Sequence, residues 1–335
     1  MMKKLVMFLG LVLVVLLGAC GSTNDSKDNE SSEKDTDSNM EERTITIEDA
    51  YGEQTIDGTP ERIVVLEWSF AEHLLALGIQ PVGVADLDGF HQWVNIEKEF
   101  DDSVVDVGTR QEPNLEAISR LNPDLIIAVD FRHEQFIDSL EDIAPVVTFS
   151  PYGEEAVKDH YANMINEFNT VAKIVDNELE AKEVLTDLES FTEEQKQRVT
   201  DANIESSTYL ATQAYSSQNT PVIRLFTDNS MVAKIMGNLG FENAYQSDKA
   251  EIYGYSEVTV ETLQNFQDKN PQFLYIVQEE DNIFENQLKG NPVWEKLSFV
   301  QNDNMHALPG DTWTFGGVLS AKVLTEQLVN AMVKE

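Results

Sequence analysis

Residues 62–85, RIVVLEWSFAEHLLALGIQPVGVA, hold the pattern that decides the fold. The apolar run at 62–67 predicts a buried strand, and residues 69–77 predict a helix that ends at Gly78. Residues 81–85 predict the next strand. A strand, a helix and a strand in this order form a βαβ unit, in which the two strands lie parallel in one sheet.

The same alternation continues along the chain from Arg43 onward. Residues 104–107 and 124–129 predict two further strands, and the helix between them begins near Asn114 and ends before Pro123. Short strands that alternate with helices are typical of an α/β protein with largely parallel sheets.

The second half of the chain repeats the order of the first. Residues 114–118 (NLEAI) precede Asn-Pro at 122–123 and a predicted strand, and residues 259–263 (TVETL) precede Asn-Pro at 270–271 and another strand. Leu-Gly-Ile at 77–79 likewise has a counterpart in Leu-Gly-Phe at 239–241. Any two βα repeats share some likeness, but the shared order predicts two Rossmann-like lobes, at residues 44–158 and 203–335.

Residues 159–202 carry no strand signal and are predicted to link the lobes. Residues 177–202 lack Gly and Pro and are rich in Glu, Lys, Gln and Leu, which predicts one long helix. At 1.5 Å per residue such a helix extends ~39 Å, enough to join two small lobes once. We therefore expect the lobes to rock only modestly about a cleft.

The N-terminus predicts export and lipid attachment. Two lysines are followed by fifteen uncharged residues at 5–19, which end in small residues. This is the pattern of a signal peptide over 1–19, because a membrane-spanning helix needs ~20 apolar residues. Leu-Gly-Ala-Cys at 17–20 resembles a bacterial lipobox, so Cys20 is expected to carry lipid and to anchor the protein outside the cell membrane. The alternative is an ordinary secretory signal with a stray cysteine.

The composition restricts the remaining possibilities. At ~150 residues per domain, a chain of 335 residues is long enough for two domains. With 23 Lys+Arg against 60 Asp+Glu, the formal charge of −37 repels phosphate backbones and argues against nucleic-acid binding. Residues 20–43 are polar and charged, which predicts a disordered tether. The single cysteine excludes an internal disulfide and a multi-cysteine zinc site.

The ends of the predicted strands carry the candidate ligand contacts. In open α/β sheets the ligand crevice lies at the carboxyl ends of the strands. Trp68, Arg110 and Arg132 follow strands of the first lobe and are expected to face one rim. Arg224, and Trp313 in the loop at 310–317, are the candidates from the second lobe.

Arginine side chains match anionic ligands that are rich in oxygen. A guanidinium is planar, stays charged and donates two hydrogen bonds to one carboxylate. The chain has only seven arginines, so two at strand ends of one lobe indicate a local positive cleft. A salt bridge with one of the many acids is the alternative for each arginine, and burial in the core is the alternative for each tryptophan.

No catalytic motif is present in the sequence. The histidines show no zinc-binding spacing, and there is no P-loop, Gly-x-Gly-x-x-Gly or Gly-x-Ser-x-Gly motif. His133, beside Arg132, is either a ligand contact or the start of a surface helix. We therefore expect a non-enzymatic protein without a cofactor and without direct metal ligands.

Four motifs in order, at 61–69 (ERIVVLEWS), 107–118 (VGTRQEPNLEAI), 122–127 (NPDLII) and 310–317 (GDTWTFGG), carry a specific resemblance. They resemble the iron-siderophore substrate-binding lipoproteins of ABC importers, in particular the ferric-citrate branch, from about Arg43 to the C-terminus. The resemblance implies a periplasmic-binding fold with two lobes bridged by a long helix and a ferric complex in the cleft. It implies that Arg110 and Arg132 contact the ligand. It also implies contacts from Arg224 and Trp313, in the lobe that varies with the siderophore.

The resemblance also implies a protein partner. Members of this family dock on the permease of an importer, which works with a cytoplasmic ATPase, through one surface glutamate per lobe. Glu116 and Glu261 match those positions, although an acid in the first turn of a helix is ordinarily explained by the helix dipole. The protein is expected to act as a monomer.

Several functions remain open at this point. The first is capture of a ferric citrate or carboxylate siderophore for import, and the same role for a hydroxamate or catecholate siderophore, haem or cobalamin is the nearest alternative. A secreted lipoprotein hydrolase and a purely structural surface lipoprotein are more remote alternatives.

Overall fold

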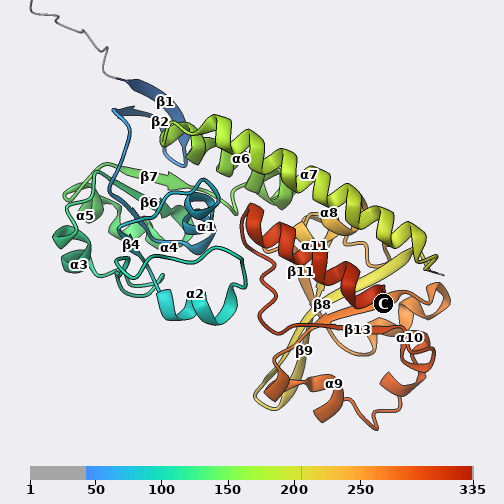
Figure 1. The fold of residues 1–335 in the computed structure, drawn as a ribbon. Coiled ribbons are helices and arrows are strands. Elements are labelled where there is room, and N and C mark those ends of the chain that lie inside the picture. Colours follow the sequence, from blue (N-terminus) through green and yellow to red (C-terminus); the bar gives the residue numbers. More distant parts are fainter. Residues whose placement is uncertain (1–42, 205, 334–335) are drawn as a thin grey trace, which may run out of the picture. The chain divides into compact units, whose positions relative to one another are not determined.

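A computed structural model describes residues 43–204 and 206–333 (Figure 1). The predicted signal peptide, Cys20 and the tether up to residue 42 lie outside the described residues. The described residues form one compact unit. Among the described residues, no helix is both long enough and apolar enough to cross a membrane.

The first lobe is built on a five-stranded parallel sheet whose strands lie in the order β5-β4-β3-β6-β7. Strands β3, β4 and β5 follow one another in one direction, and β6 and β7 continue on the other side of β3. The point where the order reverses therefore lies between β3 and β6, which is where ligands bind in Rossmann-like sheets. The strands are β3 (Ile63–Val65), β4 (Gly83–Val84), β5 (Val105–Asp106), β6 (Leu125–Val129) and β7 (Val146–Phe149).

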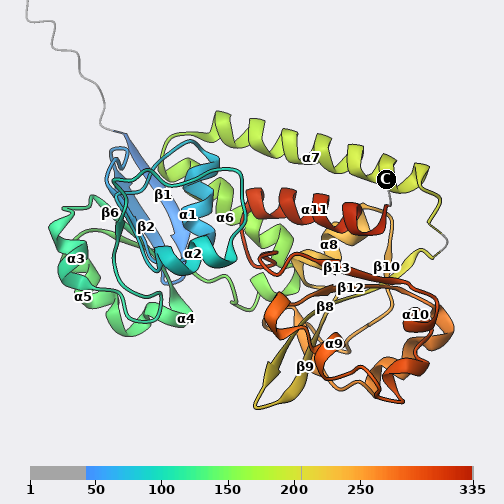
Figure 2. The same cartoon turned by 60° about the horizontal axis from the view of Figure 1, so that its bottom comes forward.

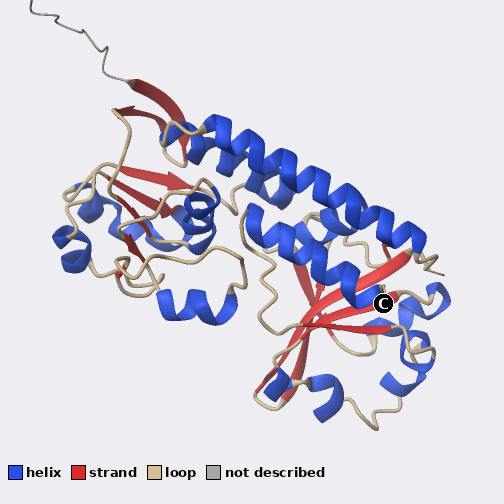
Figure 3. Ribbon diagram, in the orientation of Figure 1, coloured by secondary structure: helices blue, strands red, loops and turns tan. Residues whose placement is uncertain are grey.

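Helices cover both faces of this sheet (Figure 3). The predicted helix after β3 is present, and Gly78 ends it with a φ of 75°, a conformation that glycine adopts without strain. The helices of this lobe are α1 (Trp68–Ala76), α2 (Leu87–Trp93), α3 (Leu115–Arg120), α4 (Asp130–His133), α5 (Ile137–Glu141), η1 (Glu134–Phe136) and η2 (Ala156–Lys158). The expected βαβ pattern is confirmed.

An antiparallel hairpin precedes the sheet. It consists of β1 (Thr44–Asp49) and β2 (Gly52–Asp57), and the amide of Ala50 donates to the carbonyl of Thr148 on β7, 2.7 Å away. Arg43 donates to the carbonyls of Lys173 and Ile174 at the end of α6 (His160–Ile174). The hairpin is thereby attached to both the first lobe and the helix that leaves it.

The second lobe differs from the expected parallel arrangement at one edge. Strands β10, β12 and β13 run parallel to their neighbours, whereas β9 is antiparallel to both β8 and β11. Gln218 and Asn219 join β8 to β9 with φ values of 50° and 60°, the geometry of a two-residue hairpin turn. The strands are β8 (Thr208–Ser217), β9 (Thr220–Phe226), β10 (Glu242–Asn243), β11 (Tyr255–Val258), β12 (Gln272–Ile276) and β13 (Met305–Leu308).

The helices of the second lobe include one that departs from prediction. The segment after Glu261, expected to repeat α3, is a 3-10 helix, in which the amides of Thr262 and Leu263 donate to carbonyls three residues earlier. Leu263 is its one buried side chain, so little packing supports a full α-helical turn. The helices are α8 (Met231–Asn238), η3 (Thr262–Lys269), η4 (Glu279–Asp281), α9 (Ile283–Asn286), η5 (Trp294–Lys296), α10 (Ser298–Gln301) and α11 (Val318–Met332).

Two helices connect the lobes. The predicted long helix is α7 (Glu178–Asp201), which spans 24 residues and lies beside α11 of the second lobe (Figure 2). The start of the predicted linker is the separate helix α6, and Asp176 turns the chain between them with a φ of 58°. All strands of the first-lobe sheet precede α6 in the chain, and all strands of the second-lobe sheet follow α7.

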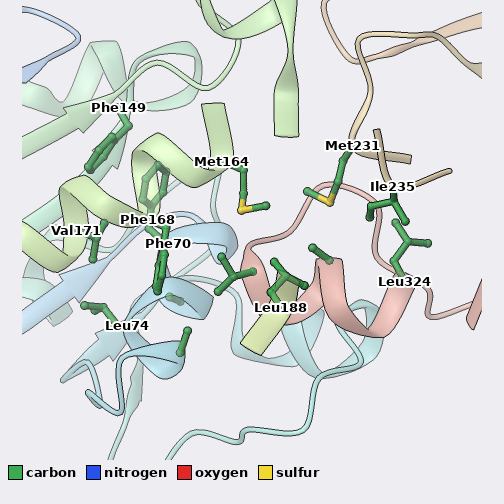
Figure 4. Packing of buried hydrophobic residues seen from close by; sticks show 14 of the residues in the cluster. Phe70, Leu74, Phe149, Met164, Phe168, Val171, Leu188, Met231, Ile235 and Leu324 are labelled. Carbon is green, nitrogen blue, oxygen red and sulfur yellow. The ribbon is translucent and has the colours of Figure 1, made fainter. Parts of the chain in front are cut away.

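The lobes also share one apolar core. A single cluster joins Phe70 and Phe168 on the first-lobe side to Met231, Ile235 and Leu324 on the second-lobe side (Figure 4). Side chains packed on both sides resist separation, because parting them would expose apolar surface to water. The connection between the lobes is therefore more than a linker helix.

Candidate functional site

A cavity of about 560 Å³ lies between the lobes, where the switch point of the first-lobe sheet faces the second lobe. Glu67 follows β3 and Arg132 follows β6, so the first-lobe wall comes from the strand ends selected by the sequence. The second lobe contributes Arg224 and the loop containing Trp313. The cavity thus brings together Arg110, Arg132, Arg224 and Trp313, four of the predicted ligand contacts.

One carboxylate holds the two arginines of the first lobe. Arg110 Nη1 lies 2.8 Å from Glu67 Oε1, and Arg132 Nε lies 2.7 Å from Glu67 Oε2. A carboxylate that bridges two arginines in this way fixes both guanidinium groups before a ligand arrives. Glu67 was not among the residues selected from the sequence. The available signal was its position at the end of the predicted strand at 62–67, directly before Trp68.

Trp68 does not line the cavity, which corrects its predicted role as a ligand wall. It is 2% exposed, and its indole N–H donates to the carbonyl of Ala85 at 3.1 Å. As the first residue of α1 it turns toward the core, where its ring packs edge-on against Phe90. The guanidinium carbon of Arg110 lies 3.4 Å from the centre of its ring, a cation–π contact. Trp68 therefore supports Arg110 from below.

His133 is buried, so it is neither a surface helix start nor a ligand contact. The amide of Val129 donates to its Nδ1, which places the ring proton on Nε2, 2.8 Å from the carbonyl oxygen of Arg110. Burial is the main cause that lowers its pKa. The neutral ring holds the backbone of Arg110 against the end of β6.

Arg224 stands on the opposite wall, within β9 and not at a strand end. Its Nη2 donates to Tyr215 Oη at 2.9 Å, and its Nε lies 3.3 Å from Glu257. Its guanidinium carbon also lies 4.6 Å from the ring centre of Tyr255. The antiparallel hairpin, which was not predicted from the sequence, is what brings this arginine to the cavity.

The loop before α11 offers polar atoms without protein partners. Trp313 Nε1 and Thr314 Oγ1 are buried and make no hydrogen bond to any described residue, and both side chains line the cavity. Buried polar groups are ordinarily satisfied, so such atoms indicate places where water or a ligand is bound. Thr314 had not been selected from the sequence.

Aromatic side chains bridge the cavity between the lobes, and none of them was predicted from the sequence. The ring of Tyr152 packs against the rings of Tyr253, in the second lobe, and Phe131. The distances between ring centres are 4.9 Å to Tyr253 and 4.8 Å to Phe131. Phe131 and Tyr253 remain 41% and 46% exposed. Exposed aromatic groups beside fixed arginines are suited to cover the apolar parts of a ligand.

The two predicted docking glutamates lie outside the cavity on exposed surface. Glu116 is in the first turn of α3 and pairs with Arg120 one turn later. Glu261 precedes η3, and a hydrogen bond from the Thr259 side chain lowers its pKa. Each carboxylate is therefore accessible on its own lobe.

The described residues contain no group of three or more His, Cys, Asp or Glu side chains placed to hold a metal ion. The donors around the cavity are mostly cationic or neutral, which suits an anion better than a bare cation. An iron ion in this cavity would have to arrive with its own oxygen ligands.

Two α/β lobes joined by a long helix, with a cavity between them, form the architecture of a solute-binding protein. Residues 63–312 match the family of periplasmic binding proteins, and the chain belongs to that family.

Relatives with known names are similar in sequence to this protein over most of its length. The Fe(3+)-citrate-binding protein YfmC of Bacillus subtilis is 33% identical over 331 residues, which cover 98% of this chain and 96% of the relative. The Fe(3+) dicitrate-binding periplasmic protein FecB of Escherichia coli is 26% identical over 85% of this chain and 89% of its own length.

A solved structure shows the same fold. The siderophore-binding protein FhuD of Vibrio cholerae, bound to Fe3+-Desferal, superimposes with a TM-score of 0.70 at 28% identity. The likeness covers 82% of this chain and 98% of that one.

Proposed function

We propose that this protein captures a ferric siderophore of the citrate or carboxylate type and delivers it to the permease of an ABC importer for iron uptake. The observation that carries the proposal is the group of Arg110 and Arg132, held by Glu67, facing Arg224 across the cavity. The names of the ferric-citrate-binding relatives support this ligand class.

The chemistry of the ligand fits this cavity. Iron(III) takes oxygen ligands, and citrate-type chelators surround it with carboxylates that leave the complex negatively charged. Glu67 accepts from Nη1 of Arg110 and from Nε of Arg132, and Nε of Arg110 lies 3.7 Å from Asp86 Oδ2. Nη2 of Arg110 and the two Nη groups of Arg132 are left to bind ligand carboxylates. Since the whole chain has a formal charge of −37, the arginines form a local attractive site on a protein that otherwise repels anions.

Delivery requires attachment and docking. Cys20, as the lipidated first residue of the exported protein, would hold the protein at the outer face of the cell membrane. Glu116 and Glu261, one exposed on each lobe, would meet arginines of the permease, whose cytoplasmic ATPase drives import. These two glutamates are separate from the cavity, so docking and ligand binding use different surfaces.

A tryptophan-fluorescence titration of residues 21–335 tests the ligand class. Trp313 lines the cavity and Trp68 lies under Arg110, so a bound chelate should change their emission. Ferric citrate, a ferric hydroxamate, a ferric catecholate and iron-free citrate are compared. The proposal is supported if ferric citrate, and none of the other three, saturates the protein at submicromolar concentration. Such a concentration corresponds to a binding free energy of about −8 kcal/mol or more favourable.

Other results of the titration would change the proposed ligand or reject the proposed function. The relative FhuD of Escherichia coli is an iron(3+)-hydroxamate-binding protein, 28% identical over 82% of this chain. A preference for the hydroxamate would keep the transport role and overturn the carboxylate ligand. No response to any ferric chelate would reject the siderophore function.

A further inference from the structure

Helix α6, predicted only as part of a linker, forms a third wall of the cavity. His160, Asn163 and Glu167 all line it and occupy positions i, i+3 and i+7 of the helix. Residues at this spacing lie on one helical face. The helix that joins the lobes therefore presents a polar stripe toward the ligand.

Glu167 is unusual within this stripe because it is an acid in a cavity suited to anions. It is buried, with 8% of its surface exposed. The Asn163 side chain hydrogen-bonds to it, and the Asp130 carboxylate lies near enough to repel its charge. Burial is the largest cause that raises its pKa, to about 8, and Asp130 raises it further. The raised pKa favours the protonated carboxyl group at neutral pH, and this form can donate a hydrogen bond.

The other charged side chains around the cavity form no ion pair with Glu167. Arg110 and Arg132 pair with Glu67, and Arg224 pairs with Glu257. The remaining titratable groups that line the cavity are His160, whose pKa is lowered chiefly by burial, Tyr152 and Tyr255, whose pKa values are raised chiefly by burial, and Tyr253. Among the described groups, the one that lowers the pKa of Glu167 is the neutral amide of Asn163.

We propose that Glu167 is a ligand contact that donates its carboxyl proton in a hydrogen bond to a carboxylate oxygen of the chelate. This inference rests on the proposed function. It adds Glu167, on helix α6, to the arginines of the two lobes as a residue that determines ligand specificity. An O–H···O⁻ bond to a charged acceptor is stronger than a neutral one. The ionised side chain would instead repel the same oxygen, so the residue favours binding only while it keeps its proton.

Two substitutions distinguish the effect of ionisation of Glu167 from the effect of losing its hydrogen-bond donor. Glu167→Gln keeps the size and a donor but cannot ionise, whereas Glu167→Leu removes the donor. Glu183→Gln, an exposed glutamate of α7, is the matched control. Ferric citrate affinity of residues 21–335 is measured for all four proteins from about pH 6.5 to about pH 9.5, so that changes in the chelate affect every protein equally.

The proposal predicts a difference between wild type and Glu167→Gln that grows with pH. Above about pH 8 the dissociation constant of the wild type should rise relative to that of Glu167→Gln, approaching tenfold per pH unit. At neutral pH Glu167→Leu should bind about tenfold more weakly than wild type. Glu183→Gln should follow the wild type throughout.

Contrary results are distinguishable from failure of the proposed function. Suppose that wild type binds ferric citrate and that the affinities of wild type and Glu167→Gln fall by the same factor as the pH rises. Glu167 is then not the donor, while the ligand class stands. A carbon-13 NMR titration of the ligand-free protein, with Glu167→Gln used to assign the signal, gives a second test. A Glu167 carboxyl group that titrates below about pH 6 would overturn the inference whichever chelate binds.

Discussion

The carboxylate of Glu72 on α1 binds Ser320 on α11, 248 positions later in the chain. Its Oε1 accepts from the Ser320 amide at 2.6 Å and its Oε2 from the Ser320 hydroxyl at 2.7 Å. Glu72 is 1% exposed, and burial raises its pKa while these and neighbouring amide hydrogen bonds oppose that shift. A carboxylate at a helix N-terminus is stabilised by the helix dipole, so this contact joins the lobes directly beside the ligand cavity.

The Glu72–Ser320 contact depends on close packing at Gly316. Replacing this glycine with a larger residue should weaken the contact. A Cβ at Gly316 would meet the Ser320 hydroxyl and lie 2.6 Å from Glu72 Oε2. Gly316→Ala should therefore lower the free energy of unfolding by about 1–3 kcal/mol, measured by urea denaturation. Gly237→Ala is the control, because nothing lies within 4 Å of a Cβ there and alanine favours the helix. Equal stability of the two variants would contradict close packing at Gly316.

The arginines held by Glu67 should determine affinity without being required for folding. Arg110→Ala and Arg132→Ala should each weaken ferric citrate binding more than tenfold, because each removes a charged donor from the cavity. Isothermal titration calorimetry gives the affinity, and circular dichroism verifies the fold. Arg120→Ala, an exposed arginine on α3, should bind as wild type does. Unchanged affinity in both cavity variants would reject this site.

The surface glutamates should act on transport alone. Glu116→Ala and Glu261→Ala are expected to leave ligand affinity unchanged, since neither lines the cavity, while the double variant impairs iron uptake in cells. Loss of a paired charge at an interface costs roughly 2–5 kcal/mol, so the defect should be large when both are removed. Normal uptake by the double variant would discard the docking role.

His73 should make the folded state sensitive to acid. It is fully buried beside Glu72, both ring nitrogens lack hydrogen-bond partners among the described residues, and burial lowers its pKa to about 3. Between the unfolded value of 6.5 and about 3, the unfolded chain binds a proton that the folded protein does not. Its contribution to the free energy of unfolding should therefore fall by up to about 1.4 kcal/mol for each pH unit of acidification.

His73→Leu removes this proton uptake at nearly constant volume. Urea denaturation of both proteins at several pH values should show wild type losing stability relative to His73→Leu as the pH falls below 6.5. Parallel stability curves would mean that the imidazole is already solvated or paired in the folded protein.

The strand-end rule located much of the candidate site from sequence. It selected Arg110, Arg132 and Trp313, all of which line the cavity, because apolar runs identify parallel strands and parallel strands end at one edge. The rule could not tell that Trp68 turns inward under Arg110. The orientation of a side chain at a strand end depends on the packing below it, which no local pattern encodes.

The sequence by itself determined the alternation of strands and helices in the first lobe, the two-lobe plan and the long helix α7, because hydrophobic periodicity and Gly or Pro breaks act over a few residues. Only the tertiary structure decided which distant groups meet. The bridging of Arg110 and Arg132 by Glu67, the polar stripe of α6 in the cavity and the Glu72–Ser320 contact all depend on packing between remote segments. The burial that alters the pKa values of Glu167 and His73, and the Asp130 charge beside Glu167, exist only once those segments have come together.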